Sequence, residues 1–208
     1  FVSVKTFDEE KFIVMATRKG RIKKTKLSAY GKPRKGGIYA IDIREGDELI
    51  EAKITNGEND IVLGTREGKS IRFPETDARP MGRKTRGVIG IKLSKKDDYV
   101  VGMVVVRREG TLLVATEKGF GKRTEVMQYR IQKRSGKGVL AMRTNKKVGK
   151  MVAIMEVVDT DDLMVITDTG VLIRQPVDSI RTIGRVTQGV KLIRLDEGAK
   201  ISSLSRVV

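Results

Sequence analysis

The chain has 208 residues, of which 39% are hydrophobic, so it can form a folded domain with a buried core. Its net charge of +17 indicates a polyanionic partner, either a nucleic acid or an anionic membrane surface. The sequence has no cysteine and no histidine, which excludes disulfides, thiolate zinc sites and histidine catalysis. It shows no signal peptide and no apolar run near the ~18 residues that span a membrane, so we expect a cytoplasmic or nucleoid protein.

The first predicted element recurs four times along the chain. Each copy is a short apolar run rich in β-forming residues that ends in the pattern Thr-x-x-Gly. The threonines are Thr17, Thr65, Thr116 and Thr167, and successive copies lie 48, 51 and 51 residues apart. The glycine of each pattern is expected to sit in a tight turn with a positive φ.

Three more strands are predicted after each of these runs. A mixed strand follows the turn directly, at 21–27, 69–73, 120–126 and 171–177. A loop of about ten residues then leads to a third strand that begins with glycine and an apolar residue, at 37–43, 87–93, 138–144 and 189–195. After a polar turn, the fourth strand occupies 49–54, 99–106, 151–158 and 201–208. The glycines of the third strands repeat with separations of 50, 51 and 51 residues.

The Thr-x-x-Gly pattern and the glycine of the third strand recur with nearly the same period, which indicates a repeat protein. Four strands in about 50 residues match one blade of a propeller, and no segment shows a sustained helical period. We therefore predict an all-β, propeller-like fold of four four-stranded blades. It is expected to form a single domain over residues 1–208, with repeats at about 1–52, 53–103, 104–154 and 155–208.

Basic residues recur in register with these repeats. Lys24, Arg72, Arg123 and Arg174 each lie seven residues after a repeat threonine. Arg83, Arg134 and Arg185 lie four residues before the second glycine, where the first repeat has Arg34 and Lys35. Equivalent positions on adjacent blades would form a curved basic band that a long polyanion could follow. Alternatively, basic side chains at strand edges could serve to prevent aggregation.

The densest basic site is residues 132–138, where three cations accompany two glycines. Glycine lets backbone N–H groups approach phosphate, so this loop is expected to bind the DNA backbone without reading bases. The four repeats carry net charges of +4, +4, +10 and −1, so removing Arg134 or Lys137 is expected to weaken binding more than removing Arg174 or Arg185. The predicted DNA contacts are Lys23, Lys24, Arg34, Lys35, Lys69, Arg72, Arg83, Lys84, Arg86, Lys122, Arg123, Gln132, Lys133, Arg134, Lys137, Arg174 and Arg185.

Candidate enzyme motifs are weak. Residues 64–70 resemble a phosphate-binding P-loop but are one residue short between the glycines, and Pro74 prevents the helix that should follow. The acidic groups at Asp97–Asp98 and at 159–162 fall at expected turns, where solvated side chains are favoured over a metal site. Tyr30 and Tyr129 share one repeat position, which indicates packing. We expect no catalytic residue, metal or cofactor in this chain.

Three stretches, 79–93, 121–139 and 183–198, resemble the C-terminal domain of the DNA gyrase A protein, and the resemblance extends over the whole chain. It implies a β-pinwheel, in which blades exchange strands and basic residues line the rim. It also implies a monomeric accessory domain that wraps double-stranded DNA and supports negative supercoiling. Its implied partners are the rest of the gyrase A protein and the gyrase B protein of the holoenzyme. The catalytic tyrosine of the family lies in another part of the enzyme.

The family hallmark is the box Gln-Arg-Arg-Gly-Gly-Lys-Gly, which residues 132–138 match at five of seven positions, with departures at Lys133 and Ser135. The family usually has six blades, so we expect these four to be the last four. The A-type subunit of topoisomerase IV, a close relative with more degenerate blades, is the alternative family member. A propeller scaffold that binds proteins and an RNA-binding domain remain the other hypotheses.

Overall fold

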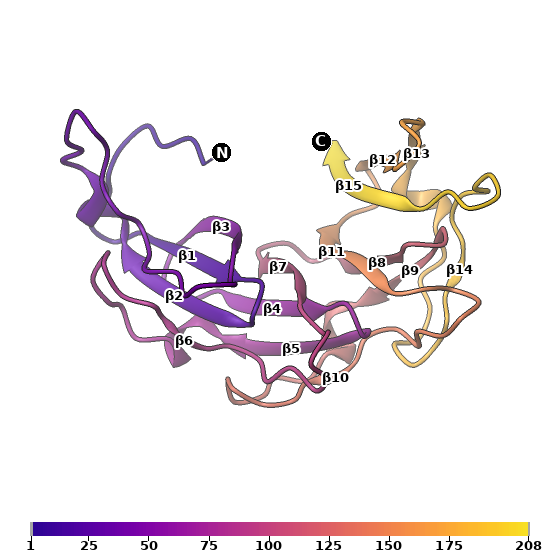
Figure 1. The fold of residues 1–208 in the computed structure, drawn as a ribbon, viewed down its shortest axis with the longest axis horizontal. Coiled ribbons are helices and arrows are strands. Elements are labelled where there is room, and N and C mark those ends of the chain that lie inside the picture. The colour runs from indigo at the N-terminus through magenta and orange to yellow at the C-terminus, as the bar shows by residue number, and fades with distance from the viewer. Residues whose placement is uncertain (1, 208) are drawn as a thin grey trace.

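A computed structural model describes residues 2–207 and shows four antiparallel sheets arranged side by side along a crescent (Figure 1). The three long strands of each sheet come from one predicted repeat. The all-β prediction is confirmed, since the helices in the described range are four 3-10 turns of three or four residues. None of them is long and apolar enough to cross a membrane.

Each of the first three sheets takes its outermost strand from the following repeat. In the first sheet, β3 (Leu49–Thr55), β1 (Phe12–Thr17) and β2 (Arg21–Lys26) come from one repeat, and β6 (Val88–Ile89) comes from the next. β6 pairs antiparallel with the start of β2. Adjacent blades are therefore joined by an exchanged strand as well as by packing.

The second and third sheets repeat this order. The outermost strands β10 and β14 are again supplied by the following repeat and pair with β5 and β9. The bounds are β7 (Val100–Val106), β4 (Asp60–Thr65), β5 (Lys69–Pro74) and β10 (Val139–Leu140) in the second sheet, and β11 (Met151–Val157), β8 (Thr111–Thr116), β9 (Phe120–Glu125) and β14 (Val190–Lys191) in the third.

The fourth sheet corrects the prediction of four strands in every blade. It has three strands, β15 (Ile201–Val207), β12 (Asp162–Thr167) and β13 (Leu172–Pro176), and β13 forms an open edge. The predicted third strand of the first repeat, at 37–43, is likewise assigned no strand. Both differences have one cause: third strands pair with the preceding blade, and these two positions have no neighbour in the described structure.

Short turns connect the strands as the glycine pattern predicts. The glycines that end the Thr-x-x-Gly patterns have φ values of 80° to 85°, and those that begin the third strands have values of 70° to 80°. A 3-10 turn follows the second strand of every repeat, at η1 (Leu27–Tyr30), η2 (Glu75–Asp77), η3 (Val126–Gln128) and η4 (Val177–Ser179).

The hydrophobic core consists of three layers, one between each pair of adjacent sheets. Successive residues of a strand enter different layers: Ile61 and Leu63 of β4 pack toward the first sheet, while Val62 packs toward the third. Leu113 and Val165 belong to the third layer. Because inner strands bury both faces, they read as continuous aliphatic runs, and few aromatic residues are needed to fill the core.

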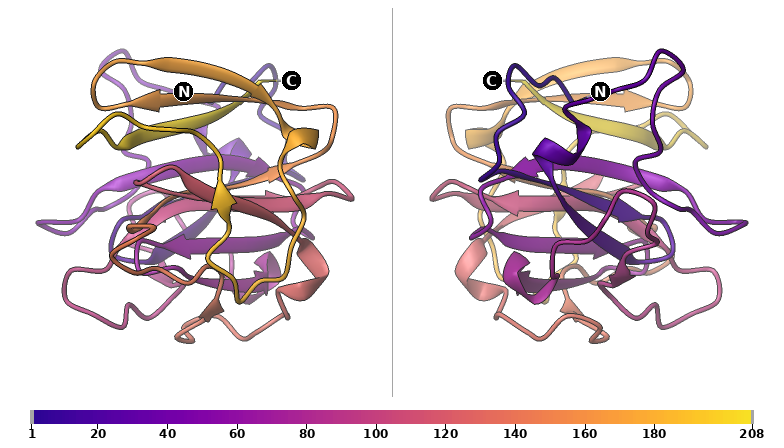
Figure 2. Two further views of the ribbon diagram at one scale, coloured as in Figure 1. Left: turned by 90° about the vertical axis from the view of Figure 1, so that its right-hand side faces the viewer. Right: turned by 90° about the vertical axis from the view of Figure 1, so that its left-hand side faces the viewer.

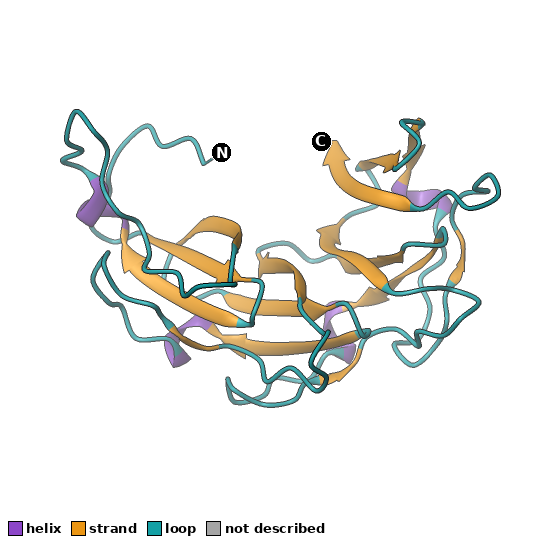
Figure 3. Ribbon diagram, viewed as in Figure 1, coloured by secondary structure: helices purple, strands orange, loops and turns teal. Residues whose placement is uncertain are grey.

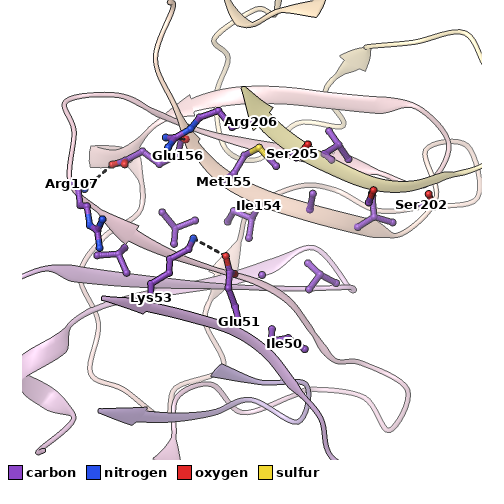
Figure 4. A pocket seen from close by; sticks show the side chains of 18 residues that line it. Ile50, Glu51, Lys53, Arg107, Ile154, Met155, Glu156, Ser202, Ser205 and Arg206 are labelled. Atoms are coloured by element: carbon purple, nitrogen blue, oxygen red, sulfur yellow. Dashed lines mark hydrogen bonds and ion pairs between the residues drawn. The ribbon is translucent and has the colours of Figure 1, made fainter. Parts of the chain in front are cut away.

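The concave and convex sides of the crescent differ in structure. The strands β3, β7, β11 and β15 line the concave side around a cavity of about 620 Å³ (Figures 1 and 4). Its carboxylates are held by neighbours: Glu51 pairs with Lys53 at 2.8 Å, and Glu156 accepts hydrogen bonds from the backbone N–H groups of Arg107 and Arg108. The exchanged strands and the long loops before them lie on the convex side, as the loop colouring in Figure 3 and the end views in Figure 2 show.

Candidate nucleic-acid interface

Most of the excess positive charge lies in three segments on the convex side, which we call the basic rim: residues 79–92, 130–143 and 181–194. These segments contain five, five and four basic residues and no acidic residue. The rest of the chain is left with 29 basic and 26 acidic residues, which is close to balance. The net charge of the chain is therefore a property of its outer edge.

Hydrogen bonds between successive repeats join the rim segments into a continuous band. The Lys92 backbone N–H donates to Gly136 O at 2.8 Å, and the Ser135 N–H donates to Gly90 O at 2.7 Å. At the next junction, the Arg143 N–H donates to Thr187 O at 3.0 Å. The Lys92 and Arg143 bonds join equivalent backbone groups at the two junctions, so the basic side chains are displayed at a regular interval.

The structure leaves many predicted contact residues accessible on the rim. Lys84, Arg86, Lys133 and Lys137 are exposed, and Arg83, Gln132, Arg134 and Arg185 are partly exposed. Arg134 is also anchored, because its Nη1 donates to Ile89 O at 2.8 Å. Arg185 makes the equivalent bond to Leu140 O. These two arginines connect each rim loop to the strand of the preceding repeat and keep part of the guanidinium accessible.

Lys23 and Lys122 are placed differently from the prediction. Both side chains are completely buried, with 0% exposure. The Lys23 ammonium donates to the backbone carbonyls of Ala40 and Arg83, and the Lys122 ammonium donates to those of Gly184 and Arg185. Burial lowers the pKa of both lysines to about 8, and a nearby arginine contributes in each case. They support the rim loops from inside and cannot reach a phosphate on the surface.

The residues seven positions after each repeat threonine also have structural roles. Lys24 is buried and pairs with Glu75 of the next repeat at 3.0 Å. Arg72 pairs with Asp60 at 2.6 Å and donates to carbonyls of the next repeat, and buried Arg123 likewise donates to Ile180 O at 2.7 Å. The recurrence of this position is explained by contacts between blades, so the buried members are not available to a surface ligand.

The remaining predicted residues lie away from the three rim segments. Arg34 and Lys35 are exposed in the corresponding loop of the first repeat. Lys69 is half-buried at the start of β5. Arg174 is exposed on the open edge β13, where it pairs with Asp162 at 2.6 Å. Only Arg34 and Lys35 among these extend the basic rim along the chain.

The loop at 132–138 has an unusual backbone conformation. Ser135 has a φ of 69° and is the one non-glycine residue with a positive φ among residues 2–207. This left-handed conformation is strained for serine, and it occurs at a position where the family box has glycine. It directs the Ser135 N–H to Gly90, so the strained residue takes part in joining the second and third rim segments.

Sequence reasoning missed two recurring sets of exposed basic residues on the rim. Arg79, Arg130 and Arg181 lie fourteen residues after a repeat threonine, and Lys92, Arg143 and Arg194 lie five residues after the second glycine. Both sets keep the repeat period, so an alignment of the repeats could have revealed them. Lys191, on β14, is a further exposed rim residue.

The weak enzyme motifs are explained by the fold. Residues 64–70 form the hairpin turn between β4 and β5 rather than a loop that precedes a helix. Asp161 is buried and pairs with Arg108 at 2.8 Å, and Asp98 is also buried, so the prediction of solvated side chains is wrong for these two residues. Asp97 and Asp159 are exposed, as predicted. Within residues 2–207, no group of three or more acidic side chains could hold a metal ion.

Comparison with known families agrees with this architecture. The model of the DNA gyrase C-terminal domain, a β-propeller, matches four segments, at 11–56, 59–107, 110–157 and 161–207, which together cover most of the chain. The chain belongs to the DNA gyrase C-terminal domain family. Each matched segment corresponds to one predicted repeat.

Curated relatives are DNA gyrase A proteins. The chain is 39% identical over 231 aligned residues to that of Haemophilus influenzae, and 42% identical over 207 residues to that of Mycolicibacterium smegmatis. The alignments cover 98% and 99% of this chain but only 26% and 24% of the relatives. The chain thus corresponds to about a quarter of a gyrase A protein, in its accessory C-terminal domain.

Two solved structures share the fold. A DNA gyrase A C-terminal domain matches with a TM-score of 0.87 and 23% identity, covering 99% of this chain and 68% of that domain. A C-terminal domain of DNA topoisomerase IV matches with a TM-score of 0.92 and 24% identity, covering 98% of this chain and 64% of that domain. The pinwheel architecture is therefore confirmed.

Proposed function

We propose that the basic rim binds double-stranded DNA and guides it around the convex side of the crescent. The observation that carries this proposal is the segregation of charge: fourteen basic residues and no acidic ones occupy the three rim segments. A curved array of cations attracts the phosphate backbone at successive helical turns. Because no recognition helix is present in residues 2–207, we expect contacts to phosphate rather than to base edges.

The composition of the rim favours DNA over a protein partner. The exposed side chains that recur in register on the rim are arginines and lysines, whereas a protein-binding propeller would be expected to present an apolar centre in its interface. RNA offers the same phosphate charge, so competition between duplex DNA and structured RNA distinguishes these partners. We expect duplex DNA to compete better, because a smoothly curved rim can follow a long, regular duplex.

A pair of double variants tests the rim directly. Lys133→Gln/Lys137→Gln removes two exposed rim charges, and Lys146→Gln/Lys147→Gln removes two exposed charges from the turn after the third strand. Net charge changes equally, so a difference between the variants reports position. Each lost phosphate contact should reduce the slope of log affinity against log salt by about 1. Equal losses in the two variants would contradict binding at the rim.

Wrapping requires a topological measurement in addition to affinity. A nicked plasmid is sealed by ligase with the protein bound, and the linking number is then compared with that of the free plasmid. We expect a shift in the topoisomer distribution that the Lys133/Lys137 double variant reduces. Binding with no shift would show that this chain contacts DNA without wrapping it.

The proposal extends to the enzyme in which such a domain works. As an accessory domain, the chain would present a DNA segment to the rest of the gyrase A protein and to the gyrase B protein, in the bacterial cytoplasm at the nucleoid. Gyrase A proteins match this chain at 39–44% identity, which favours gyrase over topoisomerase IV. That the four blades are the last four of six stays a prediction.

A further inference from the structure

A hollow of about 350 Å³ lies where the third blade meets the fourth, beside the turn between β8 and β9. Four lysines line it, each from a different segment, together with residues that include Phe120, Leu195 and a single acidic residue, Asp196. The lysines are Lys118, Lys147, Lys191 and Lys200. All four are exposed, and within residues 2–207 none of them forms an ion pair. Like charges that converge on one hollow repel one another, so this arrangement favours the binding of an anion.

The junction between the second and third blades has a carboxylate at the centre of a similar group of lysines. Glu67 lies two residues after its repeat threonine, which is the position that Lys118 occupies in the third repeat. The two Glu67 carboxylate oxygens pair with Lys95 and Lys150, at 2.5 Å each. Lys95 comes from the turn that precedes β7, and Lys150 immediately precedes β11. At this junction the lysines are therefore neutralised by a side chain of the protein itself.

The junction between the third and fourth blades keeps these lysines and replaces the carboxylate. Lys146 is at the repeat position of Lys95, eight residues after the second glycine, and Lys200 precedes β15 as Lys150 precedes β11. Lys118 stands in the place of Glu67, and its ammonium donates to the Lys146 carbonyl at 2.5 Å. A cation has thus replaced the anion, and the surrounding lysines have lost the carboxylate that would neutralise them.

The lysine cluster is not a general requirement of the fold. The junction between the first and second blades also has a lysine, Lys19, at the repeat position of Lys118. There, however, Ile89 and Tyr99 occupy the positions of Lys191 and Lys200. Among the three junctions, the unpaired cluster occurs at one, so repeat periodicity and contacts between blades do not account for it.

The size and lining of the hollow indicate the class of anion. Lysine ammonium groups bind phosphate as compact point charges, and several of them around one site suit an anion with several charges. A hollow of about 350 Å³ can hold a small molecule but does not admit a DNA duplex. Phe120 is partly exposed and adds an aromatic side chain, with Lys191 Nζ 5.8 Å from its ring centroid. A nucleotide base could contact this ring, whereas inorganic polyphosphate would use the lysines alone.

We propose that this hollow binds a small polyphosphate, whose negative charge takes the place that the Glu67 carboxylate has at the preceding junction. The shared chemistry is a chain of linked phosphates, supplied either by a nucleoside triphosphate or by inorganic polyphosphate. The site lies apart from the basic rim except for Lys191, and the proposal does not depend on DNA binding.

Lys118→Glu tests the site by rebuilding the Glu67 arrangement at this junction. The new carboxylate would pair with the neighbouring lysines, so we expect polyphosphate binding to be lost while the melting temperature rises or stays unchanged. Lys133→Gln/Lys137→Gln is the matched control, because it lowers the net charge by the same amount at the exposed rim. A general attraction of polyphosphate to this basic chain would therefore fall equally in both variants.

Isothermal titration calorimetry at constant ionic strength, without divalent cations, gives the readout with sodium tripolyphosphate and with ATP as probes. We expect saturable binding at a single site in the parent chain and in the control, and binding weakened about tenfold or more in Lys118→Glu. Equal affinity for the two probes would identify the phosphate chain as the recognised group, and tighter binding of ATP would identify a nucleotide.

Three results would overturn the proposal. The first is a parent chain that shows no saturable binding of either probe, and the second is an equal loss of binding in the two variants. The third comes from fluorescence anisotropy with duplex DNA: if Lys118→Glu lowers DNA affinity as much as the rim variant does, the lysines belong to the DNA surface. Failure of DNA binding at the rim would appear separately, as an unchanged DNA affinity in Lys133→Gln/Lys137→Gln.

Discussion

The ammonium of Lys122 lies inside the protein and donates a hydrogen bond to the carbonyl of Gly184 in the next repeat, at 2.9 Å. The same ammonium also reaches Arg185 O and the Thr187 hydroxyl, so one buried lysine holds the centre of a rim loop. Lys23 holds the loop around Arg83 in the same way. Repeats two and four have isoleucine at this position, Ile71 and Ile173.

Replacing Lys122 with isoleucine should therefore leave a well-packed strand and a loosened loop. We expect the free energy of unfolding to fall by about 1–3 kcal/mol, because loop carbonyls lose their donor. Amide exchange at residues 184–187 should accelerate, and DNA affinity should fall although the side chain never reaches the surface. Urea unfolding and hydrogen exchange measure these effects. Unchanged exchange in this loop would contradict a supporting role for Lys122.

The buried lysines also predict how stability depends on pH. Burial lowers the pKa of Lys23 and Lys122 to about 8 from the ordinary 10.5, so between these values the unfolded chain binds more protons than the folded one. Stability contributed by these groups should therefore rise from pH 8 toward pH 10.5. The measurement is the difference in unfolding free energy between the parent chain and Lys23→Met/Lys122→Met at pH 7 and pH 9.5. A difference that favours the parent chain less at pH 9.5 would contradict the shift.

Ser135 offers a test of backbone strain in the rim. Because its φ is 69°, Ser135→Gly should relieve a strain of about 1–2 kcal/mol, partly offset by the greater entropy of glycine in the unfolded chain. We expect a net stabilisation of about 0.5–1 kcal/mol. Ser135→Val should destabilise the protein, because a β-branched residue tolerates this conformation poorly. Thermal unfolding of both variants is the measurement, and a destabilised glycine variant would contradict the prediction.

Arg134 and Lys137 lie in the same loop but should behave differently on mutation. Lys137 is exposed, so Lys137→Gln should weaken DNA binding and leave unfolding unchanged. Arg134 donates to Ile89 O at 2.8 Å, so Arg134→Gln should weaken binding and lower stability by about 0.5–1.5 kcal/mol. Fluorescence anisotropy and urea unfolding separate the two effects. Charge removal at Arg174 should matter less for binding, because this side chain pairs with Asp162 away from the rim.

The main strands of each blade were predictable because their apolar runs and turn glycines keep one period. The third strands were overestimated: an apolar stretch such as 87–93 contributes only Val88–Ile89 to a sheet. Beyond this short strand, the N–H groups of Gly90 and Ile91 donate to Gly20 O of the preceding repeat, and the N–H of Lys92 donates to Gly136 O of the following one. The strand exchange was expected only from the family resemblance, because hydrogen bonds between distant segments leave no local pattern in the sequence.

The sequence predicted only part of the candidate site, because it does not show which recurring basic residues are exposed. A recurring cation such as Arg123 can serve either a ligand or the adjacent blade, and periodicity alone does not distinguish these roles. Burial does: Arg123 contacts Ile180 O inside the protein, whereas Arg130, overlooked in the sequence, is exposed on the rim. Charge segregation over whole segments indicated the exposed basic rim better than recurrence at single positions did.

Strand exchange also determines how the protein unfolds. When one repeat unfolds, its own three strands leave their sheet. The outer strand that this repeat contributes to the preceding blade is lost as well. Local unfolding at one repeat therefore weakens its neighbour, and nearest-neighbour coupling of this kind makes a row of repeats melt cooperatively. Within residues 2–207, the blade that contains β13 has no outer strand from another repeat. We expect thermal fraying to begin there and to advance along the crescent toward β1.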